Sequence, residues 1–287
     1  MSAPTRVHVG EHVLDVVDLG PQDGPAVLLL HGFPQSSWEW RSVWPALAGA
    51  GYRVLAPDQR GYSPGARPSG VDASRMSALV GDALDLLDAV GVRRAHVVGH
   101  DWGAAVAWQL AGRHPDRVRS LTAVSVPHPA AFSAALRSDA DQRERSQYML
   151  AFNEPDAEER LLADGARWLR TGFGALPDAD RYVQRMQEPG ALTAALNWYR
   201  AQRSGMRDPL PPVTVPTLHV WSDQDAALGA TAAYATASHV AGPYRFQVLA
   251  GVSHWVPEEA PEQLVPMLLE HLRTAAGQPD EEAATPG

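Results

Sequence analysis

The stretch 97-VVGHDWGAA-105 places an acidic residue where a buried strand meets a helix. Its first residues are apolar, as in a strand inside a sheet, whereas residues 102–114 have helical periodicity and many small side chains. A sharp turn between them needs little bulk at its flanks, which Gly99 and Gly103 provide, and it leaves the middle residue projecting above the sheet. The stretch therefore predicts a strand-turn-helix elbow with Asp101 at its apex.

Short apolar runs recur on both sides of this elbow, and segments with helical periodicity lie between them. Residues 7–20 alternate apolar and polar side chains around Gly10 and predict an antiparallel hairpin. Strands that alternate with helices favour an α/β fold with a mostly parallel, doubly wound sheet and right-handed crossovers. The expected strands are 26–31, 52–57, 94–99, 120–126, 217–221 and 244–250, and the expected helices are 36–51, 74–91, 102–114 and 260–275.

The alternation is interrupted once, between Val126 and Pro216. That interval has no strong strand run but contains helical patterns, and a structureless loop of this length is improbable. We therefore expect a helical cap, or lid, inserted into the core. The predicted organisation is core over 1–127, cap over 128–210, core over 211–275, and a disordered acidic tail over 276–287.

The composition excludes several classes of protein. The chain has 287 residues, 45% of them hydrophobic, which is enough for one large domain with a substantial core. A net charge of −9 without lysine or arginine runs argues against binding to nucleic acid or to an anionic membrane. The absence of cysteine removes disulfides and thiolate metal sites. No signal peptide or membrane-spanning run is visible, so we expect a soluble, cytoplasmic protein.

The first loop that could act together with Asp101 is 31-HGFP-34, at the end of the first buried strand. Parallel strands bring their carboxyl ends to one edge of the sheet, so the backbone N–H of Phe33 could join that of Trp102 in an oxyanion hole. Two simpler interpretations stay open at this point: Asp101 could be only the N-cap of its helix, and HGFP could be only a tight turn.

An acid and a base follow two later strands. The sequence 221-WSDQDAALG-229 offers two candidate acids, Asp223 and Asp225, and 250-AGVSHWVP-257 contains His254 just before the C-terminal helix. The chain order of nucleophile, acid and histidine, each after a strand, is the order that nucleophile-elbow hydrolases use. This order favours a catalytic site over isolated loop residues.

Residues 5–275 resemble the α/β-hydrolase superfamily, and HGFP, DQRGYS, GHDWG, WSDQD and SHW together are similar to its epoxide hydrolase and haloalkane dehalogenase branch. The family pattern Trp-Gly-x-x-Asp maps onto Trp221, Ser222 and Asp225, with serine in place of glycine. The resemblance thus favours Asp225 as the acid, with Asp223 as the weaker alternative. In some dehalogenases the acid follows the sixth strand, where this chain reads SVPHP and has no carboxylate.

The segment 58-DQRGYS-63 also resembles a family motif, and we interpret Asp58 and Arg60 as structural residues that hold the loop. It overlaps the only G-x-S-x-G match, 61-GYSPG-65. Pro64 follows that serine and no helix pattern lies directly behind it, which argues against a serine esterase.

An aspartate nucleophile suits a particular reaction. A carboxylate with an ordinary pKa near 3.9 is already ionised at neutral pH, so Asp101 needs no base in order to attack a saturated carbon. His254, oriented by Asp225, is then free to activate water for hydrolysis of the resulting ester, while Phe33 and Trp102 N–H groups hold the oxyanion. This design favours epoxides and alkyl halides over carboxylic esters.

Tyrosines in the cap distinguish these two substrates. An opening epoxide develops an alkoxide, which phenols can hydrogen-bond and protonate, whereas a halide needs N–H donors. Tyr148 lies in a Tyr-x-x-x-Phe-x-x-Pro context and Tyr199 in Asn-Trp-Tyr-Arg, and both contexts resemble those of the lid tyrosines of epoxide hydrolases. We interpret Tyr182, the third cap tyrosine, as structural.

The sequence evidence for a dehalogenase is weaker than the evidence for an epoxide hydrolase. Trp102 could supply an indole N–H to a halide, but epoxide hydrolases also carry tryptophan there, and many dehalogenases have asparagine where this chain has Phe33. Fluoroacetate-type dehalogenases carry arginines soon after the nucleophile. Here Ala104 and Ala105 stand close to that place and the first arginine is Arg113, which argues against small charged acids as substrates.

The sequence therefore predicts an epoxide hydrolase with Asp101, Asp225, His254, Tyr148 and Tyr199 as catalytic residues. Phe33 and Trp102 are expected to line the substrate site, and a small hydrophobic epoxide is the expected ligand, with no metal or organic cofactor. Haloalkane dehalogenase is the alternative, and an inactive ligand-binding member of the family is a third possibility. A monomer or a homodimer is expected.

Overall fold

The computed structural model describes residues 4–202 and 209–276. Its strands form one eight-stranded sheet in the order β1-β2-β4-β3-β5-β6-β7-β8. The hairpin β1–β2 turns at Gly10 and is antiparallel; β2 also pairs antiparallel with β4, and all later pairs are parallel. The predicted α/β-hydrolase fold is confirmed. The strands are β1 (Thr5–Val9), β2 (His12–Leu19), β3 (Ala26–Leu30), β4 (Arg53–Pro57), β5 (Ala95–His100), β6 (Val118–Val124), β7 (Thr217–Ser222) and β8 (Tyr244–Leu249).

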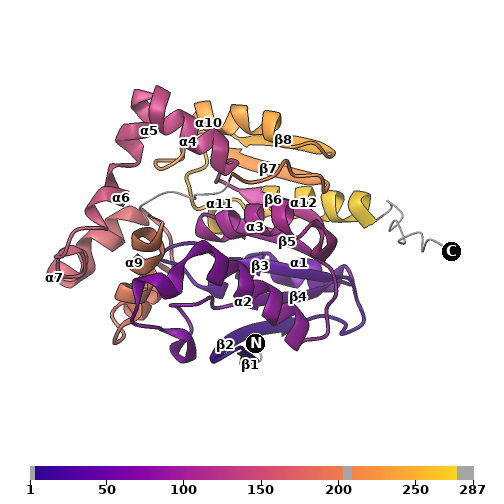
Figure 1. Cartoon of the computed structure of the whole chain (residues 1–287), viewed down its shortest axis with the longest axis horizontal. Coiled ribbons are helices and arrows are strands. Elements are labelled where there is room, and N and C mark those ends of the chain that lie inside the picture. The colour runs from indigo at the N-terminus through magenta and orange to yellow at the C-terminus, as the bar shows by residue number, and fades with distance from the viewer. Residues whose placement is uncertain (1–3, 203–208, 277–287) are drawn as a thin grey trace.

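The central strands are apolar throughout because both faces of the sheet are covered. Successive side chains of a strand point to opposite faces. In β3, Val27 and Leu29 belong to a cluster that includes side chains of α1 (Trp44–Gly49) and α12 (Pro261–Ala276), whereas Leu28 and Leu30 pack with α2 (Met76–Ala89) and α3 (Trp102–Arg113). The resulting three layers are visible in Figure 1.

The segment predicted as one helix over 36–51 is divided in two. A 3-10 helix, η1 (Ser37–Ser42), precedes α1, and Pro45 stands in the first turn of α1, where proline favours a helix start and lacks the N–H that would continue the preceding turn. The remaining core helices are η2 (Pro64–Ala66), η3 (Val71–Ser74), η4 (Pro115–Arg117), α10 (Ala230–Ala235), η5 (Thr236–His239) and α11 (Val256–Glu259).

Between β6 and β7 the regular elements of the described chain are all helices, apart from an isolated bridge at Val213. We call helices α4–α9 the lid; they gather at one end of the sheet (Figure 1). Helix α7 is interrupted at Asp164, Gly165 and Ala166, which have left-handed φ values of 51°, 68° and 62°. The lid helices are α4 (Pro129–Ser138), α5 (Ala140–Arg145), α6 (Gln147–Ala151), α7 (Ala157–Gly172), α8 (Ala179–Met186) and α9 (Ala191–Ala201).

The predicted domain boundaries stay predictions, and the described helices can be located relative to them. The lid helices lie inside the segment 128–210, of which residues 203–208 are outside the described residues. The expected disordered tail falls at 277–287, also outside the described residues, except that Ala276 ends α12. Within the part of the chain that the structure describes, no helix combines the length and the apolar composition needed to cross a bilayer.

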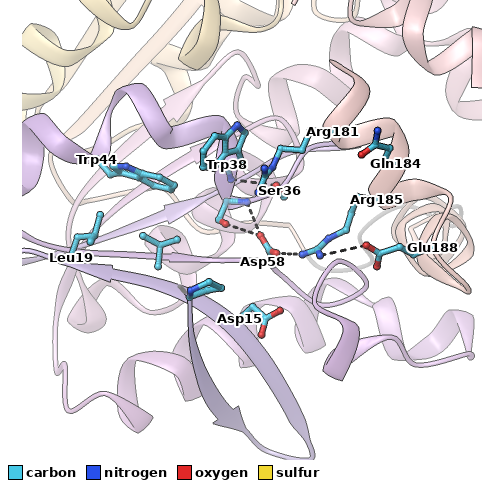
Figure 2. A pocket seen from close by; sticks show the side chains of 13 residues that line it. Asp15, Leu19, Ser36, Trp38, Trp44, Asp58, Arg181, Gln184, Arg185 and Glu188 are labelled. Carbon is cyan, nitrogen blue, oxygen red and sulfur yellow. Dashed lines mark hydrogen bonds and ion pairs between the residues drawn. The ribbon is translucent and has the colours of Figure 1, made fainter. Parts of the chain in front are cut away.

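Ion pairs join the lid to the core. Arg185 of α8 pairs with Asp58, which follows β4, and Arg67 pairs with Glu188 at 2.5 Å. A groove of about 480 Å³ lies along this seam, where the guanidinium of Arg181 stands over the Trp38 ring (Figure 2). The groove contains no predicted catalytic residue, so it is separate from the site described next.

Candidate active site

The predicted elbow is present at the end of β5. Asp101 links β5 to α3 with φ 49° and ψ −122°, a strained backbone conformation for a residue with a side chain. A Cβ atom on Gly99 would collide with the carbonyl oxygen of Gly103, and one on Gly103 would collide with that of Leu30. Both glycines are therefore required for the close packing of α3 against the sheet.

The carboxylate of Asp101 is not a helix cap, because it makes no capping hydrogen bond to α3. Its Oδ1 atom instead accepts a hydrogen bond of 2.8 Å from the backbone N–H of Phe33. Its Oδ2 atom lies 3.5 Å from Nε2 of His254. Asp101 thus occupies the N-cap position without capping the helix through its side chain, and the residue is only 7% exposed.

The loop after β3 provides the backbone donor. Gly32 lies so close to Asp101 that a Cβ atom would collide with the aspartate side chain, and this approach places the Phe33 amide against Oδ1. Trp102 is the first residue of α3, so its N–H has no acceptor inside the helix. Its indole ring and the Phe33 ring both contact Tyr199, with centroid distances of 4.9 and 5.4 Å.

The structure distinguishes the two candidate acids. Asp225 is buried, and its Oδ2 lies 2.8 Å from Nδ1 of His254. Its Oδ1 accepts the backbone N–H groups of Ala227 and Leu228, which fix the carboxylate in place. Asp223 is exposed and accepts the backbone N–H of Gly251 instead. Asp225, not Asp223, is therefore the partner of His254.

The charges of Asp101 and His254 stabilise one another. Burial by itself would raise the pKa of Asp101, but the hydrogen bond and positive charge of His254 outweigh it and hold that pKa below the ordinary value. Burial by itself would lower the pKa of His254, but the charge of Asp225 and the hydrogen bonds with Asp101 and Asp225 raise it to about 10. At neutral pH the site contains an aspartate anion beside a histidine cation.

Two of the three cap tyrosines form a pair beside the loops of Phe33 and Trp102, whose rings contact Tyr199. Tyr148 in α6 and Tyr199 in α9 contact each other, with ring centroids 6.2 Å apart. Burial, chiefly, raises the pKa of both phenols above the ordinary tyrosine value, and the charge of Asp101 contributes to each shift. Both remain protonated, so two potential O–H donors lie in the surroundings of the Asp101 charge.

The three residues that we interpret as structural, Asp58, Arg60 and Tyr182, form hydrogen bonds with other side chains or backbone groups of the fold. Asp58 accepts the backbone N–H and the hydroxyl of Ser37, and Arg60 donates two hydrogen bonds of 2.6 Å to Asp82. Tyr182 is buried, and its hydroxyl donates to Glu258 at 2.9 Å.

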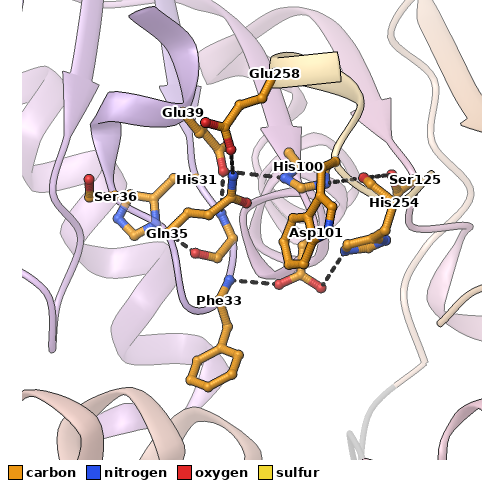
Figure 3. Close-up of polar contacts among 12 residues, drawn as sticks. His31, Phe33, Gln35, Ser36, Glu39, His100, Asp101, Ser125, His254 and Glu258 are labelled. Atoms are coloured by element: carbon orange, nitrogen blue, oxygen red, sulfur yellow. Dashed lines mark hydrogen bonds and ion pairs between the residues drawn. The ribbon is translucent and has the colours of Figure 1, made fainter. Parts of the chain in front are cut away.

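Sequence reasoning missed a buried polar cluster behind His254 (Figure 3). Glu39 of η1 and His100 of β5 are both fully buried and lie next to each other, while Glu258 of α11 pairs with Arg41 at 2.6 Å. The available signal was the acid of WEW, isolated between two tryptophans in the predicted helix after HGFP. That pattern is equally typical of an exposed helical residue.

Comparisons with known proteins show which family the chain is similar to. A family described as alpha/beta hydrolase fold matches residues 25–261. AB hydrolase superfamily protein YfhM of Bacillus subtilis is 37% identical over 91% of this chain and 94% of its own. Epoxide hydrolase A of Mycobacterium tuberculosis is 36% identical over 95% of this chain and 98% of the relative's own length. The crystal structure of epoxide hydrolase A from Mycobacterium thermoresistibile superposes with a TM-score of 0.84 at 31% identity, over 95% and 98% of the chains.

Proposed function

This chain belongs to the α/β-hydrolase family and to its epoxide hydrolase branch, and on that premise we propose that it converts an epoxide and water to a vicinal diol through an ester on Asp101. The observation that carries the proposal is an ionised carboxylate that accepts the Phe33 backbone N–H beside a pair of lid phenols, of which Tyr199 contacts the rings of Phe33 and Trp102 and Tyr148 contacts Tyr199. A nucleophile and a proton donor for the departing oxygen are thus available together.

In the first step Asp101 attacks one carbon of the epoxide, and the bond from that carbon to the ring oxygen breaks. Its Oδ1 is already occupied by the Phe33 amide, so Oδ2 forms the new bond and Oδ1 becomes the carbonyl oxygen of the ester. The ring oxygen takes the electron pair of the broken bond. Tyr148 and Tyr199 hydrogen-bond to it as its charge grows and supply its proton. The proton of the His254 cation then restores the phenol, which leaves His254 neutral for the second step.

In the second step water attacks the Asp101 carboxyl carbon. His254 accepts a proton from that water, with Asp225 holding Nδ1 so that Nε2 faces the reaction. The Phe33 and Trp102 amides hold the oxyanion that develops on Oδ1. Collapse of this intermediate breaks the bond from the carboxyl carbon to Oδ2 and releases the diol, which contains one former aspartate oxygen and takes its proton from His254. The proton that the water left on the Asp101 carboxyl then passes to His254, which restores the resting pair of anion and cation.

A hydrophobic epoxide suits the surroundings of Asp101. The rings of Phe33, Trp102, Phe152 and Tyr199 contact one another beside the carboxylate. Such a lining binds apolar substituents and excludes water from the nucleophile. The cytoplasmic location and the oligomeric state, monomer or homodimer, stay predictions from the sequence.

Isotope labelling tests the covalent step. In a single turnover with excess enzyme in ¹⁸O-water, the diol receives an oxygen from the protein, so the first product is unlabelled and the label enters Asp101. Mass spectrometry of the diol and of the peptide that contains Asp101 measures both. Label found directly in the first diol would exclude the Asp101 ester.

Halide release distinguishes the alternative activity, haloalkane dehalogenation, from epoxide hydrolysis. Chloride or bromide liberated from haloalkanes, with epoxides left intact, would reassign the chain as a haloalkane dehalogenase. Binding of an epoxide without turnover or ester would instead indicate the inactive ligand-binding protein. We expect that each protein molecule forms diol over many turnovers and that the ester does not persist as an end product.

A further inference from the structure

The buried cluster behind the proposed base connects two loops of the site. Glu39 lies on η1, and its Oε2 accepts the backbone N–H of Gly32 at 3.3 Å, directly before the Phe33 amide. The same oxygen lies 3.3 Å from Nδ1 of His100. Nε2 of His100 lies 2.9 Å from the backbone carbonyl oxygen of His254. Figure 3 shows these contacts as one continuous chain.

The hydrogen-bond partners determine which atoms of Glu39 and His100 carry a proton in this series of contacts. A carbonyl oxygen only accepts hydrogen bonds, so Nε2 of His100 must carry the proton that reaches the His254 carbonyl. In a neutral imidazole Nδ1 is then an acceptor. The hydrogen of the contact with Glu39 must in that case come from the carboxyl group, which requires Glu39 to be protonated.

The other consistent arrangement is an imidazolium at His100 and a carboxylate at Glu39. It would leave Oε1 of Glu39 as an anionic oxygen that has no hydrogen-bond partner among the described residues, at a high desolvation cost. The nearby guanidinium of Arg41 pairs with Glu258 and Asp178.

The electrostatic surroundings favour the neutral arrangement. Burial, followed by the charge of Glu258, raises the pKa of Glu39 well above its ordinary value. Burial, followed by the charge of His254, lowers the pKa of His100 to about 4. Both shifts disfavour charge on the group concerned.

We propose that Glu39 is a positioning residue that acts as a neutral carboxylic acid: it donates its proton to His100 and so fixes the loop of His254 relative to the loop of Phe33. Its role follows from what it joins. Through Gly32 it restrains the amide that holds Oδ1 of Asp101, and through His100 it restrains the backbone of the base. This inference rests on the proposed function for its effect on turnover, but the protonation of Glu39 does not.

Two substitutions test whether Glu39 acts by donating a proton to His100 or only by filling space in the core. Glu39→Gln keeps the shape and an N–H donor for His100 and cannot ionise, but its NH₂ group no longer accepts the Gly32 N–H, a contact that is long at 3.3 Å. Glu39→Leu keeps apolar volume and removes both contacts. We expect E39Q to retain kcat within about threefold, and E39L to lose about tenfold to a hundredfold in kcat at a nearly constant KM, the range typical of groups that orient a reacting group. Single-turnover rates of ester formation and ester hydrolysis locate the loss in each variant.

An infrared difference spectrum tests the proton itself. The parent minus E39Q at about pH 8, where exposed carboxyls are ionised, should contain the carbonyl stretch of a protonated carboxylic acid. A carboxylate band in its place would overturn the proposal, as would E39Q losing as much activity as E39L or E39L retaining full activity.

The spectrum also separates this inference from the proposed function. It needs only folded parent and E39Q protein, so it remains decisive if E39L does not fold. A parent that hydrolyses no epoxide would refute the proposed function, while the infrared band would still report whether Glu39 is protonated.

Discussion

Nε2 of His254 lies 3.5 Å from Oδ2 of Asp101, so the proposed base lies next to the carboxylate oxygen that is proposed to attack the substrate. In the resting protein this contact joins a cation and an anion, and each keeps the other charged. Formation of the ester removes the negative charge of Asp101. The histidine then loses part of the interaction that raised its pKa, so the first step converts it from a stored cation into a usable base.

The pH dependence of the two steps follows from this contact. Ester formation requires ionised Asp101, whose pKa is lowered, and should therefore persist into mildly acidic solution. Ester hydrolysis requires unprotonated His254; in the ester its pKa falls below the resting value of about 10, so hydrolysis should rise with pH and level off below that value. Stopped-flow tryptophan fluorescence from about pH 5 to about pH 10 measures both rates. A hydrolysis midpoint at the resting pKa would contradict the expected change.

Replacement of the base should trap the intermediate. In His254→Gln the carboxylate of Asp101 remains, so ester formation proceeds, but no group accepts the proton of water. We expect one equivalent of substrate to be consumed per protein, with the mass of one substrate molecule added to the peptide that contains Asp101. Steady turnover by this variant would remove His254 from its assigned role.

The two aspartates after β7 form a matched pair of substitutions. In Asp225→Asn the single remaining oxygen is claimed by the amides of Ala227 and Leu228, so the NH₂ group faces His254 and favours the tautomer with hydrogen on Nε2. That tautomer accepts no proton from water, and hydrolysis should fall by about 10³–10⁴-fold. Asp223→Asn, at an exposed position, should leave both steps nearly unchanged. Equal losses in the two variants would contradict the assignment.

The phenols can be removed without loss of their rings. Tyr148→Phe or Tyr199→Phe deletes one donor to the developing alkoxide and should lower the rate of ester formation by about 10²–10³-fold. The double variant should not open epoxides. The ring contacts of both residues are retained, so near-UV circular dichroism and thermal unfolding should match the parent. Substantial epoxide turnover by the folded double variant would discard the role of both tyrosines.

The elbow tolerates no added carbon. Gly103→Ala would press a methyl group against the carbonyl of Leu30, and since backbone cannot move aside easily, we expect at least about 3 kcal/mol of destabilisation or no folded protein. Gly81→Ala is the control, because Gly81 lies in α2 with open space at its Cβ position. It should stabilise the protein by about 0.5–1 kcal/mol. Urea unfolding measures both variants, and a stable G103A would refute the packing argument.

Much of the core could be predicted because its determinants are local. Parallel strands covered on both faces are continuous apolar runs, and the elbow needs glycine at two fixed positions around Asp101. The division of 36–51 at Pro45 was readable in principle, but helical periodicity spans both pieces and conceals it.

The residues that escaped prediction depend on contacts far apart in the chain. Glu39 contacts His100 from 61 residues away, and His100 meets the His254 carbonyl across 154. No periodicity or spacing near WEW distinguishes a buried acid from an exposed one. Its environment is created only when η1, β5 and the loop of His254 come together, which is a property of the folded chain.

The division of the site between core and lid also has an evolutionary consequence. The carboxylate, the acid and the histidine all follow strands of the sheet, whereas both phenols come from α6 and α9 in a segment inserted between β6 and β7. On the proposed assignment, recombination that replaced this insertion would leave the machinery for making and breaking the ester intact while changing which leaving group is accepted. Selection can therefore act on the bond that is broken and on the enzyme ester almost independently.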